Sequence, residues 1–141
     1  MNIVIYTSLP EDGAAIRNDV FVKEQGFQKE FDETDRHARH MVLYDHGVPA
    51  AVCRFYKSER AGEYIVGRIA VVQSYRGRKL GALILKKAEE EIKKEGGKSV
   101  ALHAQERAAV FYEKQGYLRY GEPDFDEDCP HIWMRKELNL L

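Results

Sequence analysis

The sequence has few of the features that mark disulfide-rich, metal-binding or membrane-spanning proteins. Its 141 residues contain only two cysteines, Cys53 and Cys129, which do not form a Cys-x-x-Cys pair. Neither a disulfide framework nor a zinc site is therefore expected. No metal site is predicted. Four of the histidines do not form a metal-ligand spacing with nearby cysteines or carboxylates; they are His37, His40, His46 and His103. No apolar run approaches the roughly 20 residues that span a bilayer, so no membrane association is expected.

Net charge is also almost absent. The chain has 22 lysines and arginines against 23 aspartates and glutamates, which gives a formal net charge of −1. A general nucleic-acid binder is normally clearly basic, so no nucleic-acid partner is predicted. The N-terminal residues carry neither a basic segment nor a cleavage site, so no signal peptide is expected and a cytoplasmic protein is predicted. The length predicts a single domain over residues 1–141.

Hydrophobic periodicity and turn residues predict an alternation of strands and helices. Strands are expected at 2–7, 40–44, 48–56, 64–72, 99–103, 117–120 and 131–137. Helices are expected at 12–24, 79–95 and 107–115, and a hairpin turn at 45–47. Residues 28–39 are predicted to form a loop or a broken short helix, and residues 122–130 an acidic loop. Asp12 is the expected cap of the first helix, with Ala15, Ile16, Val20 and Phe21 on its apolar face.

The resulting order is β-α-(loop/α)-β-β-β-α-β-α-β-β. It predicts an α+β fold of three layers, in which a mixed, largely antiparallel sheet is flanked by helices. A meander of strands comes first. A βαβ crossover through the helix at 79–95 then follows, and it is expected to be right-handed.

Residues 67–85 carry the strongest functional signal in the chain. A β-branched apolar run ends at Val72, a loop rich in arginine and glycine follows, and a helical apolar pattern then begins. The free N–H groups and the dipole at a helix N-terminus favour an anion, and Gly77 and Gly81 permit close approach of the backbone. Arg76, Arg78 and Lys79 add positive charge. The loop therefore indicates a pyrophosphate site, although similar loops also occur for purely structural reasons.

Two motifs in this context resemble the GNAT family of acyl-CoA N-acyltransferases. The family's pyrophosphate signature, Gln/Arg-x-x-Gly-x-Gly/Ala, is matched at 76–81, with Lys79 in place of its first glycine. The family's helix motif, Asn-x-x-Ala-x-x-x-Tyr-x-x-x-Gly-Phe/Tyr, is matched at 105–117, with Gln105 in place of asparagine. The resemblance covers nearly the whole chain. The segments 16–26, 32–35 and 129–131 are similar to the small ElaA-like or YjcF-like branch of the family.

The resemblance implies acetyl-CoA as the cofactor and a set of residues that bind it. Main-chain groups of β-branched and small residues in the fourth strand would contact the pantetheine arm and polarise the thioester carbonyl. The residues from Arg76 to Ala82 would hold the pyrophosphate. The complete set implied is Ile69, Ala70, Val71, Arg76, Gly77, Arg78, Lys79, Leu80, Gly81, Ala82, Gln105, Ala108 and Tyr112.

Two residues are candidates for proton transfer. At its motif position Tyr112 would donate a proton to the departing CoA thiolate, because a phenol within hydrogen-bond reach can serve as a general acid. Many family members have a glutamate base on the strand before the loop, whereas here Gly67 and Arg68 occupy that place. His131 is a candidate base, since histidine titrates close to neutral pH, and a structural role for it is equally compatible with the sequence.

The acceptor is less defined than the cofactor. The acidic run Glu30, Asp32 and Glu33 lies where the family places its acceptor-site lid, and it would attract a cationic amine. Arg36 and Arg39 offset part of that charge, and Glu24 and Gln25 could line the same site. The expected partners are a small-molecule or peptide amine and, because GNAT proteins are often dimers, a second copy of the chain.

These observations lead to a primary hypothesis and two alternatives. The first is an N-acetyltransferase that moves an acetyl group from acetyl-CoA to a primary amine by direct attack, without a covalent enzyme intermediate. The second is a CoA-binding sensor or interaction module with little catalysis, which the missing glutamate base keeps open. A nucleotide-phosphate-binding protein is a third, distinguishable by ligand stabilisation with ATP rather than CoA.

Overall fold

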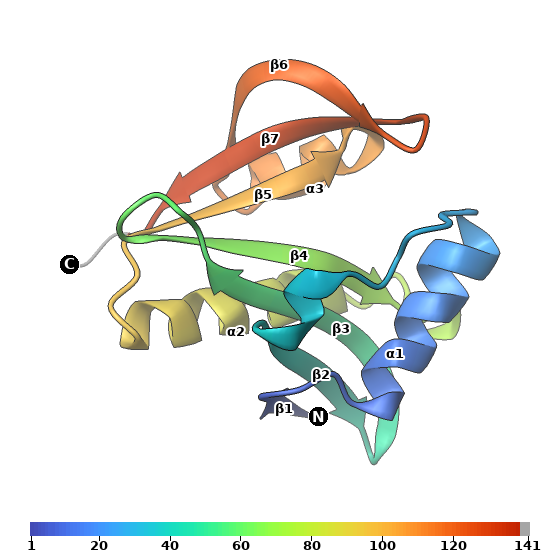
Figure 1. Cartoon of the computed structure of the whole chain (residues 1–141). Helices are drawn as coiled ribbons and strands as arrows, with labels where there is room; N and C mark the ends of the chain where they lie inside the picture. Colours follow the sequence, from blue (N-terminus) through green and yellow to red (C-terminus); the bar gives the residue numbers. More distant parts are fainter. Residues whose placement is uncertain (139–141) are drawn as a thin grey trace. The chain divides into compact units, whose positions relative to one another are not determined.

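The computed structural model describes residues 1–138 and has the predicted order of elements. Its strands are β1 (Asn2–Tyr6), β2 (Arg39–Asp45), β3 (Val48–Lys57), β4 (Glu63–Val71), β5 (Ser99–Gln105), β6 (Leu118–Asp126) and β7 (Cys129–Glu137). Its helices are α1 (Glu11–Arg17), α2 (Leu80–Lys94) and α3 (Ala109–Lys114), and four short 3-10 or π segments lie at 18–24, 33–36, 73–75 and 106–108. The strands join in the order β1-β2-β3-β4-β5-β7-β6 (Figure 1). The predicted mixed, largely antiparallel sheet with helices is confirmed.

The chain forms two compact units. The first contains residues 1–56 and 66–88, and the second contains residues 57–65 and the chain from Glu89 onward. The strand β4 and the helix α2 each contribute residues to both units. The β4–β5 pair, which consists of Glu63↔Ser99, Tyr64↔Val100 and Ile65↔Ala101, lies wholly in the second unit and is parallel, as the predicted βαβ crossover requires.

The first unit begins with an antiparallel meander of β1, β2 and β3. The register of β2 and β3 brings Asp45 opposite Val48 across a two-residue turn. His46 and Gly47 in this turn both have positive φ, 49° and 83°, which is the backbone conformation of a tight hairpin. The predicted turn at 45–47 is therefore confirmed. A core of Ile16, Val20, Phe21, Val42, Val52 and Ala70 fills this unit.

The first helix differs from the prediction in three ways. It begins after Pro10 rather than being capped by Asp12, and beyond Arg17 it continues to Glu24 as a π-helix. Ala15, predicted on the apolar face, is exposed, whereas Arg17 is buried with 2% of its surface exposed. Ile16, Val20 and Phe21 are buried as predicted, although Val20 and Phe21 lie in the π-helix. Buried Arg17 is explained by its ionic partners, described below.

Two residues in and after β4 adopt backbone conformations unusual for their type. Arg68 has φ +55° within the strand, and Lys79, just before α2, has φ +62°. Lys79 stands at the position where the GNAT signature has a glycine, and a positive φ is what glycine permits at least cost. Its carbonyl accepts a hydrogen bond from the Leu83 N–H at 3.1 Å, so α2 starts one residue later than predicted. The predicted stop at Gly96 and Gly97 is confirmed, with φ +94° at Gly96.

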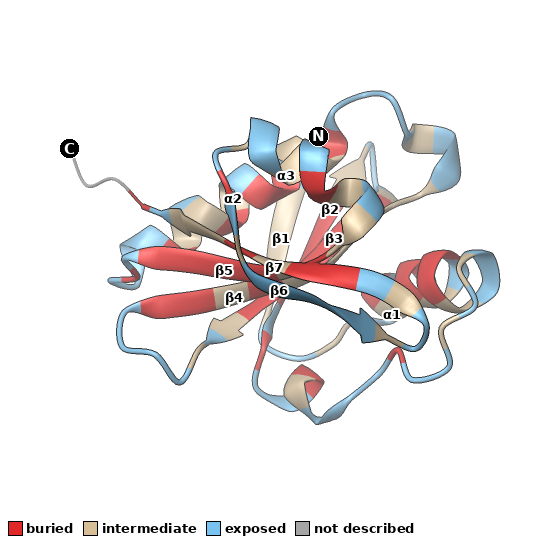
Figure 2. Ribbon diagram, turned by 90° about the horizontal axis from the view of Figure 1, so that it is seen from above, coloured by how far each residue is buried: buried red, intermediate tan, exposed pale blue. Residues whose placement is uncertain are grey.

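Among residues 1–138, the largest difference from the predicted secondary structure lies in the second unit. The expected acidic loop at 122–130 is instead a hairpin: β6 continues to Asp126, and β7 begins at Cys129. Glu127 and Asp128 form its turn with φ of 48° and 71° and without a glycine, which is why the turn was not predicted. Most of β6 is exposed, as its pale blue colour in Figure 2 shows.

Among residues 1–138, no helix is long and apolar enough to cross a membrane.

Candidate functional site

The predicted pyrophosphate residues lie in the first unit, on a continuous strand–loop–helix segment. Ile69, Ala70 and Val71 end β4, and a 3-10 turn over Gln73–Tyr75 leads to the loop that precedes α2. Positive φ at Gly77 (84°) and at Lys79 (62°) turns the backbone twice within three residues. The N–H groups of the first turn of α2 have no acceptor inside the helix. With the exposed cations on the loop, this end of α2 has the chemistry of an anion site.

Arg76 joins this loop to the end of the π-helix. Its Nη1 and Nη2 donate to Oε2 and Oε1 of Glu24, both at 2.7 Å, and its Nε donates to the Val71 carbonyl at 3.0 Å. Glu24, predicted as a lining residue of the acceptor site, is therefore bound to the predicted pyrophosphate arginine. Such a bidentate pair fixes the plane of the guanidinium group. An anion that binds at Arg76 must share it with Glu24 or displace Glu24.

The acidic segment folds over a second arginine, Arg17. Its Nε donates to Glu30 Oε2 at 2.8 Å, and its Nη1 donates to Asp35 Oδ1 at 2.7 Å. Its Nη2 donates to the Glu30 carbonyl at 3.0 Å and to Asp35 Oδ2 at 3.1 Å. Glu30, predicted to attract the acceptor, is itself 4% exposed. Its carboxylate is consequently part of a buried ion-pair network rather than of an open acidic surface.

Two further arginines complete this network. Arg54 on β3 donates to both carboxylate oxygens of Asp32, at 2.6 and 3.1 Å, and to Asp35 Oδ1 at 2.8 Å. Arg68, at its positive φ in β4, lies 3.0 Å from Glu30 Oε2 and 3.3 Å from Asp32 Oδ2. The arginine that replaces the family's usual strand glutamate therefore holds two carboxylates from the acidic segment. We call the six residues Arg17, Glu30, Asp32, Asp35, Arg54 and Arg68 the arginine–carboxylate cluster.

The sequence suggested that Arg36 and Arg39 balance the acidic segment, and this is only partly correct. Arg36 lies 3.4 Å from Glu33, and both side chains are more than 70% exposed. The carboxylates of Glu30 and Asp32 instead pair with arginines from α1, β3 and β4. These arginines are distant in sequence, so no local charge pattern could identify them.

Burial and pairing shift the pKa values in the cluster in different directions. Burial raises the pKa of Glu30, and the charge of Arg68 and the hydrogen bond from Arg17 offset this only in part. Burial would also raise the pKa of Asp35, but hydrogen bonds from Arg17 and Arg54 outweigh it and hold that pKa well below its usual range. The pKa of Asp32 is lowered too, because Arg54 outweighs the effect of burial. His40, which donates to the Asp35 carbonyl at 2.9 Å, has its pKa lowered by burial.

The other predicted site residues lie in the second unit. Gln105 is the last residue of β5, Ala108 ends the 3-10 turn that follows, and Tyr112 is in α3. The Tyr112 ring is partly buried and packs edge-on against Phe111 at 5.0 Å and Tyr117 at 6.1 Å between centroids. These contacts pack the Tyr112 ring against two neighbouring aromatic rings and fix its position.

The candidate base His131 was predicted to be the first residue of a strand. It is instead the third residue of β7. Only 5% of its surface is exposed, and its Nδ1 lies 2.9 Å from the Cys129 carbonyl. Because a carbonyl only accepts, Nδ1 carries the proton. The ring centroid lies 4.6 Å from that of His103 on β5, a residue to which the sequence gave no role.

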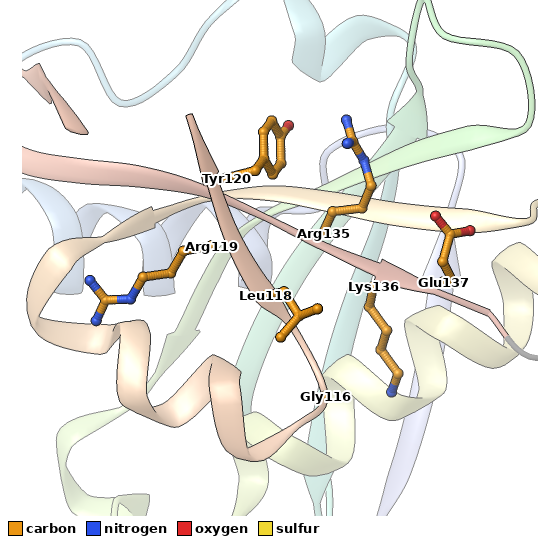
Figure 3. Close-up of a pocket in the computed structure, with 7 residues that line it drawn as sticks. All are labelled: Gly116, Leu118, Arg119, Tyr120, Arg135, Lys136 and Glu137. Atoms are coloured by element: carbon orange, nitrogen blue, oxygen red, sulfur yellow. The ribbon is translucent and has the colours of Figure 1, made fainter. Parts of the chain in front are cut away.

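An open pocket of about 530 Å³ lies in the second unit and contains none of the predicted site residues. It is lined by Gly116, Leu118, Arg119, Tyr120, Arg135, Lys136 and Glu137, with Tyr120 and Arg135 on one side of the strands and Arg119 and Lys136 on the other (Figure 3). Its cations already have partners: Arg135 pairs with Glu63 at 2.7 Å and Lys136 with Glu89 at 2.9 Å. We therefore do not assign the cofactor site to this pocket.

The order of strands and helices is that of an N-acyltransferase fold. The family model for the acetyltransferase (GNAT) domain matches residues 7–138, which cover most of both units. The chain belongs to the GNAT acetyltransferase family, as the two sequence motifs predicted.

Individual relatives agree with this assignment and with the predicted branch. The chain is 34% identical over 130 residues to YjcF of Bacillus subtilis, described as an uncharacterised N-acetyltransferase, and the match covers 90% of this chain and 91% of YjcF. The crystal structure of Escherichia coli ElaA superposes with a TM-score of 0.83 and 27% identity, covering 97% of this chain and all of ElaA. An aminoglycoside 6′-N-acetyltransferase complexed with coenzyme A shares the fold, with a TM-score of 0.76, 16% identity and 97% coverage of each chain.

Proposed function

We propose that this enzyme transfers an acetyl group from acetyl-CoA to a primary amine, with the whole chain acting as one acyltransferase domain in the cytoplasm. The observation that carries the proposal is the segment from β4 to α2, where Gly77 and Lys79 both have positive φ before the helix. A positive φ at Lys79 is a conformation that glycine adopts at little cost, so the departure from the motif is compatible with the backbone of this loop. The loop cations would then face the pyrophosphate of CoA.

In the proposed reaction, the amine nitrogen attacks the thioester carbonyl carbon. The tetrahedral species then collapses, the C–S bond breaks, and the CoA sulfur leaves as a thiolate. Tyr112 donates its hydroxyl proton to that thiolate, and a base removes one proton from the attacking nitrogen. Main-chain N–H groups near Ala70 and Val71 would stabilise the oxyanion. Ile69, Gln105 and Ala108 would complete the contacts to the cofactor.

A pair of variants matched in size but different in charge tests the pyrophosphate loop. Gly81→Asp places a side chain and a negative charge in the first turn of α2, directly after the loop, and Gly81→Asn places a side chain of similar size there without the charge. We expect calorimetry with CoA at moderate salt to show the larger loss of affinity for Gly81→Asp. Equal and undiminished affinity in both variants would contradict the loop as the binding site.

The role of Tyr112 is tested by removing only its hydroxyl group. Tyr112→Phe should lower kcat by about 10²-fold or more, the usual contribution of a general acid, and leave CoA affinity unchanged. The measurement is thiol release from acetyl-CoA with an amine. Tyr6→Phe is the control, because it removes a tyrosine hydroxyl that pairs with Tyr44 in the strands of the first unit. Unchanged turnover in Tyr112→Phe would remove Tyr112 from the mechanism.

The acceptor is proposed to be a small-molecule or peptide amine. Glu33 and Gln25 are the predicted lining residues not placed in the arginine–carboxylate cluster or in the pair with Arg76. Glu33 lies 3.4 Å from Arg36, and its exposed carboxylate would still attract a cation. Binding of CoA without thiol release on any amine would support the alternative, a CoA-binding module. Size measurements in solution would test the expected homodimer.

A further inference from the structure

One face of the sheet in the second unit carries a row of rings that the proposed mechanism does not use. His103 on β5 lies directly opposite Trp133 on β7, and the two rings stack with centroids 4.8 Å apart. The centroid of the His131 ring lies 4.6 Å from that of His103, so His103 contacts both Trp133 and His131. Tyr120 on β6 lies opposite Trp133, with centroids 6.5 Å apart. The row holds the His103 ring in one orientation.

A carboxylate completes this arrangement. His103 Nε2 lies 2.7 Å from Oδ1 of Asp124 on β6, in the part of the chain predicted to be a loop. An ionised carboxylate only accepts hydrogen bonds, so Nε2 is the donor and the lone pair of the neutral ring is on Nδ1. The Asp124 side chain is 50% exposed and that of His103 is 27% exposed, so the pair is accessible to a ligand.

His103 and His131 differ in what they can do. The Nδ1 proton of His131 is directed to the Cys129 carbonyl, and its ring is almost fully buried. His103 has its proton directed to a carboxylate that would stabilise the charged ring, and part of its side chain is accessible. A carboxylate that orients an imidazole and stabilises the imidazolium is the arrangement that general bases use. Of the two histidines, His103 therefore has the geometry of a base.

His103 lies on the same strand as Gln105, one of the proposed cofactor residues. Pairing of β5 with β4 ends at Ala101, and β5 continues to Gln105 with β7 as its partner. His103 and Gln105 alternate with Ala104, so both project from the same face of the strand. Asp124 and His131 contact His103 directly, and Tyr120 lies in the same row beyond Trp133. The Arg135 guanidinium lies over the Tyr120 ring at 4.2 Å, and its charge is paired with Glu63.

We propose that His103 is the general base of the reaction and that Asp124 positions it. This inference rests on the proposed acetyl transfer. His103 Nδ1 accepts one proton from the amine as its nitrogen bonds to the thioester carbon, and the ring becomes an imidazolium paired with Asp124. The proton is later released to solvent, and Tyr112 supplies the separate proton that the CoA thiolate takes.

The test is thiol release from acetyl-CoA with three primary-amine probes: tyramine, spermidine and a lysine peptide with a blocked N-terminus. His103→Ala should lower kcat/KM by about 10²-fold or more, with CoA affinity unchanged, and added imidazole should restore part of the loss. His103→Asn should abolish the acidic limb of the pH profile of kcat/KM, whereas His131→Asn should retain it. His46→Ala is the control, since His46 is an exposed hairpin residue.

A second measurement examines Asp124 without relying on turnover. Nitrogen NMR of the labelled protein should show His103 protonated at Nε2 in its neutral form, and Asp124→Asn should redistribute that proton between the two nitrogens. Wild-type turnover with normal kcat/KM in His103→Ala overturns the base assignment and leaves the transferase intact. Binding of CoA with no thiol release from any probe instead overturns the proposed function, and the base assignment with it.

Discussion

The arginine–carboxylate cluster of the first unit and the ion pairs at the edge strand β6 of the second unit lie in opposite environments. In the first unit, Arg17, Glu30 and Arg54 are each 5% exposed or less and belong to one connected cluster. In the second unit, Arg119 pairs with Glu106 and Glu113 on and beside the edge strand β6, where all three side chains are more than a third exposed. The same residue types therefore have different consequences. Removing one partner from a buried pair leaves an uncompensated charge, whereas an exposed pair contributes little.

The largest effect is expected when a buried cation is removed. Arg17→Met keeps much of the side-chain volume but leaves Glu30 and Asp35 without their shared partner. We expect the free energy of unfolding, measured by urea denaturation, to fall by about 3–5 kcal/mol. The matched variant Arg119→Met in the second unit should change it by about 1 kcal/mol or less. Equal effects of the two substitutions would show that burial does not distinguish the two groups of ion pairs.

The contrast also explains which parts of the molecule the sequence could predict. The segment at 76–82 and the turn at 46–47 depend on neighbouring residues. The first could be predicted from glycines next to basic residues, and the second from a glycine next to turn-forming residues. The partners of Glu30 and Asp32 come from three separate elements, so the acidic segment was interpreted as an open surface. The His103–Asp124 pair was missed because Asp124 was placed in a loop, and the hairpin that carries it has Glu127 and Asp128 at positive φ.

The acid dependence of the buried cluster gives the second prediction. The pKa of Asp35 is lowered, so its stabilising contribution is complete above the unfolded pKa of about 3.9 and is lost as the pH falls below it. The pKa of Glu30 is raised, so its charged form is penalised at neutral pH and the penalty is relieved as the pH falls. At pH 7, Asp35→Asn should therefore lower the free energy of unfolding by about 2–3 kcal/mol, and Glu30→Gln by clearly less.

The comparison is made by urea denaturation at pH 7 and pH 3. The difference between wild type and Asp35→Asn should shrink at pH 3, because below a pH of about 3.9 the unfolded wild-type chain takes up a proton at Asp35 that the folded protein does not bind. A difference that stays constant between the two pH values would contradict the role of the ionised Asp35. The exposed pair of Arg36 and Glu33 provides a control, because Glu33→Gln should have a small effect at both pH values.

Close packing, rather than buried charge, is the feature to test in the second unit. A Cβ atom added at Gly97 would lie 2.4 Å from Ile92 Cγ2 and 2.9 Å from Tyr64 Cδ1. Gly97→Ala should therefore lower the free energy of unfolding by about 1–3 kcal/mol through overpacking. The control is Gly67→Ala in the first unit, where an added Cβ meets no atom within 4 Å. A melting temperature lowered equally by both variants would argue against overpacking as the cause.

The smallest effect concerns the two hairpin turns, one in each unit, which share a backbone conformation but differ in sequence. The second position of the turn is Gly47 in the first unit, with φ +83°, and Asp128 in the second, with φ +71°. Replacing a non-glycine residue at positive φ with glycine relieves local strain but increases the freedom of the unfolded chain. Asp128→Gly should on balance stabilise the protein by at most about 1 kcal/mol, and Gly47→Ala should destabilise it by at least as much. Destabilisation by Asp128→Gly would mean that the aspartate side chain itself supports this turn, and the hairpin that presents Asp124 to His103 would then depend on that side chain.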